Sequence, residues 1–199
     1  MIMAINRKLV NWSRTIHIYL SIALLIILVF FSITGITLNH TEFFSSEPEV
    51  TEIFIDELPL FALSENGLIA DSPEFQSYLR NEFGVSLQQT SITDDGDFLL
   101  VDYRAPGLTI FIEFDLIQMQ AAGEIIDYGL IAKLNDLHKA RDTETLWIWL
   151  LDIASILLVI FSLAGLVLLL PNTYRLKRVA GYTLVAGVLI SIGYWLGTL

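Results

Sequence analysis

The chain contains three histidines, and each lies where an apolar segment meets polar sequence. His17 follows Arg14 near the start of one apolar segment, and His40 ends the same segment in the sequence GITLNH. His138 lies in LIAKLNDLHKARDTE, shortly before a second apolar segment. Imidazole binds metals and transfers protons near neutral pH. We therefore expect these three boundary positions to bind a ligand and carry the chemistry of the chain. The alternative is that they are interfacial histidines without a ligand.

The apolar segments beside the histidines are long enough to cross a membrane. Residues 16–38 carry no charge apart from a protonated His17, and 23 helical residues exceed the roughly 20 needed for a ~30 Å hydrocarbon core. Residues 145–170 contain one charged side chain, Asp152, and residues 179–199 contain none. With a mean hydropathy of +0.63 for the whole chain, the sequence predicts three transmembrane helices.

The basic residues indicate the orientation of these helices. Three Lys or Arg side chains precede the first apolar segment and three lie in PNTYRLKR, whereas the segment between the first two spans has a net charge of −16. Basic segments stay in the cytoplasm, so the acidic segment is expected outside it. We divide the chain into a cytoplasmic N-terminus with the first helix (1–40), an acidic extracytoplasmic domain (41–144), a second helix (145–171), a basic cytoplasmic loop (172–178) and a third helix (179–199).

The acidic domain is predicted to be a small α+β unit. SPEFQSYLRNEFG is typical of a helix with Ser72 as N-cap, Pro73 in the first turn and Gly84 just past the end. VSLQQTSI, FLLVDYR and LTIFIEFDLI, separated by turn residues, predict a three-stranded meander. Residues 42–71 are not assigned. The predicted fold class is a membrane α-helical protein with three transmembrane helices and an α+β domain between the first and second.

A short internal repeat links the first two spans. FSITGITL (31–38) and FSLAGLVL (161–168) share four of eight residues, and opposite span directions would make the repeat inverted in the membrane. Gly35 and Gly165 within it would allow close helix packing or make room for a flat ligand. The third span ends in GYWLG, whose glycine spacing is that of a helix–helix contact or dimer interface.

The histidine spacing bears on the ligand they would bind. The 23 residues from His17 to His40 span roughly 34 Å of helix, so these two cannot share one ligand. His40 and His138 are both expected on the outer side, and two facing neutral imidazoles are the axial ligands of a low-spin b-type haem. The chain has no cysteine, which excludes thiolate ligation and covalent c-type attachment. A haem at His17 would need a second subunit, a different second ligand or five-coordination.

Charged residues near the second span are candidates for supporting such a site. Asp152 lies seven residues into the span, where a charge facing lipid costs up to ~3 kcal/mol, so it is expected to face the helix bundle. There it would orient a histidine, pair with Lys139 or Arg141, or be protonated. Lys139 and Arg141 also suit the carboxylates of haem propionates.

The same segments resemble a known family. RTIHIYLS, FFSITGITLNH and LNDLHKARDTETLWIWLLDIASILLVIFSLAGLVLLL are similar to the PepSY-associated transmembrane helix family, in particular its short three-span branch. The resemblance covers the first two spans, and the outer domain is compatible with a PepSY-like module. It implies a bacterial inner-membrane protein with a periplasmic domain, related to proteins linked to ferric or siderophore-iron reduction through b-type haems. By position it implies His17, His40 and His138 as haem ligands. The chain has fewer spans and histidines than larger members, which favours a homodimer.

The leading functional hypothesis is electron transfer across the membrane by haem b. The electron donor would be quinol or a reductase, and the acceptor ferric iron, which would make the protein a haem-dependent ferric reductase surrounded by lipid. The acidic domain would concentrate cations and disfavour anionic siderophore complexes. No GxGxxG sequence for a dinucleotide cofactor is present, and no nucleic-acid partner is expected.

Two alternatives stay open. The first is a non-catalytic, membrane-anchored PepSY-like module that binds or regulates a partner protein. The second is direct binding of iron or manganese by His40 and His138 together with Glu42 or Asp136, without haem. A hydrolase is disfavoured because no Ser/His/Asp or HExxH pattern occurs.

Overall fold

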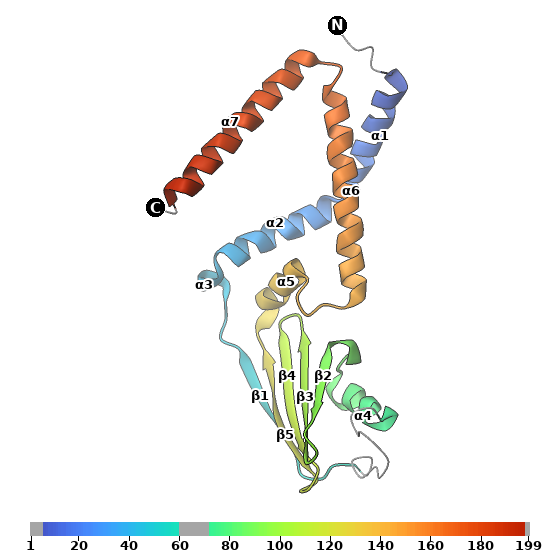
Figure 1. Ribbon diagram of the computed structural model, residues 1–199, viewed down its shortest axis with the longest axis vertical. Helices are drawn as coiled ribbons and strands as arrows, with labels where there is room; N and C mark the ends of the chain where they lie inside the picture. Colours follow the sequence, from blue (N-terminus) through green and yellow to red (C-terminus); the bar gives the residue numbers. More distant parts are fainter. Residues whose placement is uncertain (1–5, 60–71, 198–199) are drawn as a thin grey trace. The chain divides into compact units, whose positions relative to one another are not determined.

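The computed structural model describes residues 6–59 and 72–197 (Figure 1). The chain forms two compact units, one of residues 1–28 with 152–199 and one of residues 29–151. Part of the unassigned segment and the last two residues of the predicted third span lie outside the described residues. Each unit is described by itself below.

The second and third predicted spans are found as single long helices, whereas the first predicted span is divided into two helices. α6 (Thr145–Leu169) and α7 (Thr173–Gly197) are each long and apolar enough to cross a membrane. In place of one continuous first helix, α1 (Arg7–Ala23) and α2 (Leu25–Asn39) form a pair bent by 53°. The described residues therefore hold two candidate spans, or three where the bent pair counts as one span.

Most of the segment 172–178, which was predicted to be a basic loop, forms the first turns of α7. The side-chain Oδ1 of Asn172 accepts a hydrogen bond from the backbone N–H of Arg175 at 2.9 Å. This is the usual N-cap arrangement, in which a short polar side chain satisfies a free N–H of the first turn. Asn172 therefore starts the helix directly after α6, and the basic residues of PNTYRLKR are helical.

A five-stranded antiparallel sheet forms the centre of the second unit, where three strands were predicted. In the order β1-β5-β4-β3-β2 (Figure 1), its strands are β1 (Glu49–Ile55), β5 (Gln120–Asp127), β4 (Leu108–Asp115), β3 (Phe98–Ala105) and β2 (Thr90–Asp94). In chain order the sheet lies between the helices α2 and α6. β3 and β4 coincide with predicted strands, whereas β1 and β5 were not predicted.

The missed strands have weak sequence signals with a physical cause. β1 is an edge strand whose side chains are mostly exposed, so it lacks a clear apolar alternation. β5 contains Gly123, where a Cβ would lie 2.1 Å from the backbone oxygen of Phe111 on β4. The first predicted strand also begins later than expected, because Leu87–Gln89 forms a short 3-10 helix, η3, before β2.

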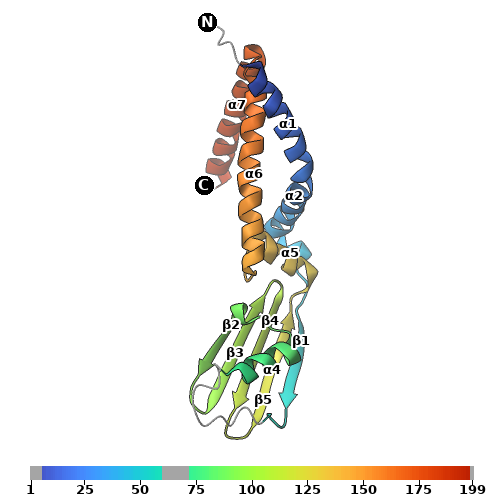
Figure 2. The same cartoon turned by 90° about the vertical axis from the view of Figure 1, so that its right-hand side faces the viewer.

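One helix covers one face of the sheet, as Figure 2 shows. α4 (Pro73–Phe83) was predicted with its caps, and its N-cap Ser72 accepts from the backbone N–H of Phe75 at 3.1 Å. Gly84 ends it with a φ of +65°, a left-handed conformation that glycine adopts without strain.

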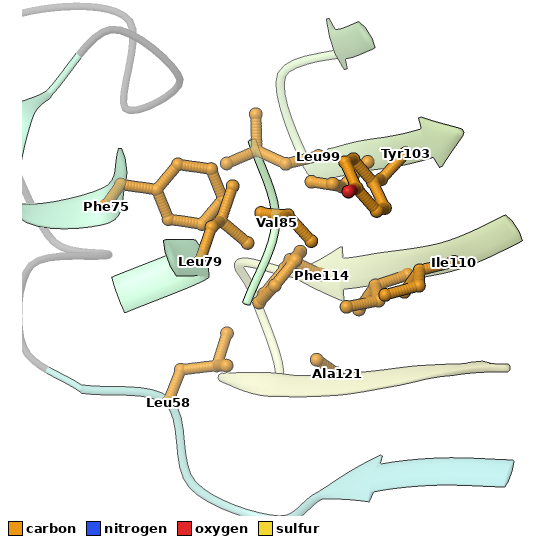
Figure 3. Packing of buried hydrophobic residues seen from close by; sticks show 11 residues of the cluster. Leu58, Phe75, Leu79, Val85, Leu99, Tyr103, Ile110, Phe114 and Ala121 are labelled. Carbon is orange, nitrogen blue, oxygen red and sulfur yellow. The ribbon is translucent and has the colours of Figure 1, made fainter. Parts of the chain in front are cut away.

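The hydrophobic core lies between α4 and the sheet (Figure 3). Phe75 and Leu79 of α4 pack against Leu99 of β3 and Phe114 of β4, and each of these side chains is at most 1 % exposed. Burying a side chain of this size contributes about 1.5–3 kcal/mol. Tyr103 joins the core, and its burial raises the pKa of its hydroxyl because the phenolate form would lose its hydration.

A short helix, α5 (Gly129–Lys139), packs on one end of the sheet. Its backbone meets the β3–β4 turn directly, because a Cβ on Gly107 would lie 2.7 Å from the backbone nitrogen of Lys133. Gly107 also has a φ of +70°, so glycine is needed there for its backbone conformation as well as for space. α5 contains His138 near its end.

Candidate functional site

Both copies of the internal repeat begin with the pattern FSxxG, at residues 31–35 and 161–165. His17 packs against the second of these. Its ring, on α1, stacks on the ring of Phe161 on α6 with centroids 4.2 Å apart and planes 10° apart. Its Nδ1 lies 3.1 Å from the backbone oxygen of Phe161. One turn further along α6, a Cβ on Gly165 would come within 3.0 Å of the His17 Cε1. Glycine at 165 therefore leaves the space that the imidazole occupies.

His138 packs against the first FSxxG sequence in a similar way. Its ring, on α5, lies 4.6 Å from the ring of Phe31 on α2. Its Nδ1 lies 2.6 Å from the hydroxyl oxygen of Thr34. A Cβ on Gly35 would lie 3.9 Å from the His138 Cε1, so glycine is again the residue one turn beyond the phenylalanine.

The internal repeat therefore corresponds to two local arrangements of the same kind. In each, a half-buried imidazole rests on a phenylalanine and on the glycine four residues later. The sequence indicated the repeat and the histidines separately. It did not indicate that the repeat at 161–168 receives His17, or that the repeat at 31–38 receives His138.

The hydrogen bonds are consistent with the same tautomer in both imidazoles. The hydroxyl of Thr34 lies 2.7 Å from the backbone oxygen of Phe30, and when it donates its one hydrogen there it accepts from the Nδ1–H of His138. The carbonyl of Phe161 can only accept, so His17 also donates through Nδ1. In the neutral rings, Nε2 then carries the lone pair. Within the described ranges, no hydrogen bond or ion pair occupies either Nε2.

His40 occupies a different environment. It lies before the short helix α3 (Thr41–Phe44), is exposed, and has its Nδ1 3.6 Å from Glu42 Oε1. His138 contacts Thr34 and Gly35, which precede His40 along α2 by several residues, or about 8 Å of helix. His40 and His138 therefore have different partners among the described residues.

The three residues of α5 that precede His138 hold it in position. Asn135 Oδ1 accepts from the hydroxyl of Thr37 at 2.6 Å, and the backbone oxygen of Leu137 accepts from the indole N–H of Trp147 at 2.9 Å. Asp136, whose side chain is only 8 % exposed, accepts from the backbone N–H of Gly107 at 3.0 Å. α5 is thus fixed to α2, to the start of α6 and to the sheet.

The charged residues near His138 have a different partner from the one that was predicted for them. Arg141 lies 2.7 Å and Lys139 3.9 Å from Asp136 Oδ1, so both predicted partners of Asp152 pair with Asp136. The signal that would have identified Asp136 is the buried polar pair Asn-Asp inside an otherwise amphipathic helix.

Asp152, which was expected to face the helix bundle, is exposed in this structure. The packed face of α6 contains Ala154 and Ala164 together with Phe161. Two residues before Ala154, the helix has turned by about 200°, which places Asp152 on the opposite face.

The direct metal-site alternative gains no support. In the part of the chain that the structure describes, no group of three or more His, Asp or Glu side chains is placed to hold a metal ion. His40 and Glu42 are close, but the other two proposed ligands, His138 and Asp136, have Thr34, Gly107 and Arg141 as partners.

Replacing Gly165 with alanine tests the fit between His17 and α6. The new Cβ would lie 3.0 Å from Cε1 and 3.2 Å from Nδ1 of His17, so we expect the ring to move and its Nδ1–H bond to Phe161 to weaken. The matched change Gly35→Ala places its Cβ at an ordinary 3.9 Å from His138 and should leave that ring in place. The measurement is the ¹⁵N chemical shifts of the two imidazoles. Equal shifts in both variants would contradict the close contact at Gly165.

Comparison with known proteins assigns the chain to a family. The comparisons with curated proteins and with solved structures found no match. The family model described as PepSY_TM-like matches residues 11–194, which include α2, the sheet, α5, α6 and nearly all of α7. The match agrees with the resemblance found in the histidine-containing segments and covers both imidazole environments. The chain is a member of the PepSY_TM-like family of membrane proteins.

Proposed function

We propose that this protein is a b-type haem protein of the bacterial inner membrane that moves electrons to an acceptor on the periplasmic side, with ferric iron as that acceptor. The observation that carries the proposal is the state of His17 and His138. Each donates its Nδ1–H to a fixed acceptor and keeps the lone pair of Nε2 available. Metal-bound histidines typically have this arrangement, because the second hydrogen bond sets the tautomer and the ring orientation.

The residues present fit a haem group at these positions. His17 and His138 would each supply one imidazole nitrogen to the haem iron, and Gly165 leaves the space that the His17 ring occupies. When bound, haem supplies one-electron redox chemistry at its iron. The chain's own contribution is to orient each imidazole through Phe161 or Thr34 and to bury it partly.

The need for a second ligand to the haem iron is the reason to propose a homodimer. Each described imidazole environment contains one histidine, whereas low-spin b-type haem takes two axial ligands. A second copy of the chain would supply the other. His40 stays a predicted ligand, and its exposed ring would have to turn away from Glu42 to serve as one.

Charge supports the proposed acceptor. The segment 41–144 has a net charge of −16, which attracts cations and repels anionic iron chelates. Free or weakly chelated ferric iron is therefore the proposed substrate. The chain has no dinucleotide-binding sequence, so quinol or a separate reductase is the proposed electron donor.

A second candidate function rests on the uncovered face of the sheet. Val50, Phe54 and Phe111 point to the face opposite the core and are 52 %, 68 % and 39 % exposed. Glu52 and Glu124 lie directly opposite each other on β1 and β5, and like charges in that position destabilise a sheet. An apolar and acidic face of this kind supports binding of a basic partner protein by a non-catalytic module.

An absorption spectrum distinguishes the two functions. The full chain is purified in detergent from haem-replete cells, recorded oxidised and dithionite-reduced, and assayed as pyridine haemochrome. Electron transfer predicts a sharp α-band of the b type on reduction, with haem in stoichiometric amounts. A featureless spectrum from folded protein would reject the haem proposal and leave the partner-binding module.

A further inference from the structure

A small cleft lies at the junction of the end of α2, α3 and α5. Its volume is about 190 Å³, which corresponds to roughly six water molecules and is enough for a phosphate with part of its glycerol. Leu38 and Phe44 form an apolar side, and Ser45 and Ser46 add hydroxyl groups. None of the three histidines lines it. The cleft is therefore distinct from the imidazole environments described above.

The cleft has a charge opposite to that of the domain around it. Lys139 and Arg141 line it and are 44 % and 60 % exposed, and Asp136 is the one acidic residue in its lining. Within the lining, two cations against one carboxylate leave one positive charge in excess, and Asp142, which lies outside the lining 3.7 Å from Arg141, offsets part of it. Segment 41–144 has a net charge of −16 and only five basic residues, of which three are Lys133, Lys139 and Arg141. Positive charge in this domain thus concentrates on α5 and at its end.

The apolar side of the cleft belongs to the end of a candidate membrane span. Leu38 lies in the last turn of α2, which forms part of the bent span pair. Phe43 and Phe44 on α3 follow directly and are 78 % and 42 % exposed. Exposed aromatic side chains at the end of a span are typical of the membrane–water interface. A ligand with an anionic head and an apolar tail matches this arrangement.

We propose that the cleft binds the headgroup phosphate of an anionic phospholipid. Lys139 and Arg141 attract the phosphodiester, the hydroxyls of Ser45 and Ser46 donate hydrogen bonds to it, and the acyl chains lie along Leu38 and Phe44. Basic pockets beside membrane spans bind anionic lipids in this way. The lipid would also hold a strongly acidic domain against a membrane surface that otherwise repels it.

Native mass spectrometry of the full chain tests the proposal. The detergent-solubilised protein is titrated with phosphatidylglycerol or with phosphatidylcholine of the same acyl chains. We expect retained phosphatidylglycerol to exceed phosphatidylcholine, and Lys139→Gln and Arg141→Gln each to lower its affinity about fivefold. Lys133→Gln is the matched control, because Lys133 lies on the same helix but not in the cleft. Since Arg141 also binds Asp136, Lys139→Gln is the primary variant and its fold is checked by circular dichroism.

Three results would overturn the lipid site. The first is equal binding of the two lipids, or an equal loss in Lys133→Gln. The second is competition by inorganic phosphate at the same concentration as the lipid, which would assign the cleft to free phosphate. The third is loss of phosphatidylglycerol on haem loading with recovery in the haem-free double variant His17→Ala/His138→Ala, which would assign the cations to haem propionates. A protein that lacks haem but binds phosphatidylglycerol selectively would reject only the electron-transfer function.

Discussion

The variant His138→Ala is expected to retain about half of the haem bound by the unchanged chain, His17→Ala about half, and the double variant almost none. The reason is that each imidazole lies in its own FSxxG environment and offers its own Nε2. Pyridine haemochrome quantitation against protein concentration gives the ratio directly. Full haem content in the double variant would show that neither histidine is a ligand.

A change beside His138 separates ligation from packing. Thr34→Val keeps the shape of the side chain but removes the acceptor of the Nδ1–H, and loss of such a partner typically lowers metal affinity about 10–100-fold. Thr183→Val is the matched control, because the Thr183 hydroxyl bonds the backbone oxygen four residues earlier, as the Thr34 hydroxyl does, and lies on α7, whereas His138 contacts α2. Equal haem affinity in the two threonine variants would contradict an orienting role for Thr34.

The variant His40→Ala tests whether His40 is the second ligand of the haem. A loss of haem equal to that in His138→Ala would assign this position to His40, which requires movement from its exposed place beside Glu42. Unchanged haem content would assign it to another group, such as a histidine of a second copy.

Local signals in the sequence predicted those helices and strands that are determined by residues close together in the chain. α4 has its N-cap at Ser72, proline in its first turn and Gly84 at its end, and all three are found in those roles. β4 alternates between buried and exposed side chains, as its sequence does. β5 was not predicted because Gly123 meets the backbone of Phe111, a contact that belongs to the neighbouring strand.

The imidazole environments also depend on contacts between residues far apart in the chain, which the sequence does not predict. The position of each histidine at the end of an apolar segment was visible in the sequence, and so was the FSxxG repeat. The pairing of His17 with Phe161 and of His138 with Thr34 joins residues 144 and 104 positions apart. No local pattern encodes such a pairing, and symmetry alone would equally have allowed each histidine to pack on the repeat of its own span.

The second large effect is expected at Asp136, the buried carboxylate that joins α5 to the sheet. Asp136→Ala leaves the buried N–H of Gly107 without its acceptor, which costs about 1–3 kcal/mol. It also removes the ion pair with Arg141, which contributes about 0–1 kcal/mol because Arg141 is largely exposed. We therefore expect the free energy of unfolding of the residue 29–151 unit to fall by about 1–4 kcal/mol. Chemical denaturation of the full chain in detergent measures this change.

Two further variants identify which contact of Asp136 is responsible. Asp136→Asn keeps an oxygen acceptor for Gly107 and loses only the charge, so it should cost less than Asp136→Ala. Asp102→Ala removes an exposed pair with Arg104 on the sheet and should lower the free energy of unfolding much less than Asp136→Ala does, because solvent screens that pair. Hydrogen exchange then localises the effect. Faster exchange of the α5 amides in Asp136→Ala, with unchanged exchange in β4, means that α5 has separated from a sheet that stays folded.

The imidazole of His138 reports on the same change. Because His138 is held by α5, its ring in Asp136→Ala should also lose the Nδ1–H tautomer. An unchanged His138 ¹⁵N shift would show that Thr34 orients the ring without the sheet.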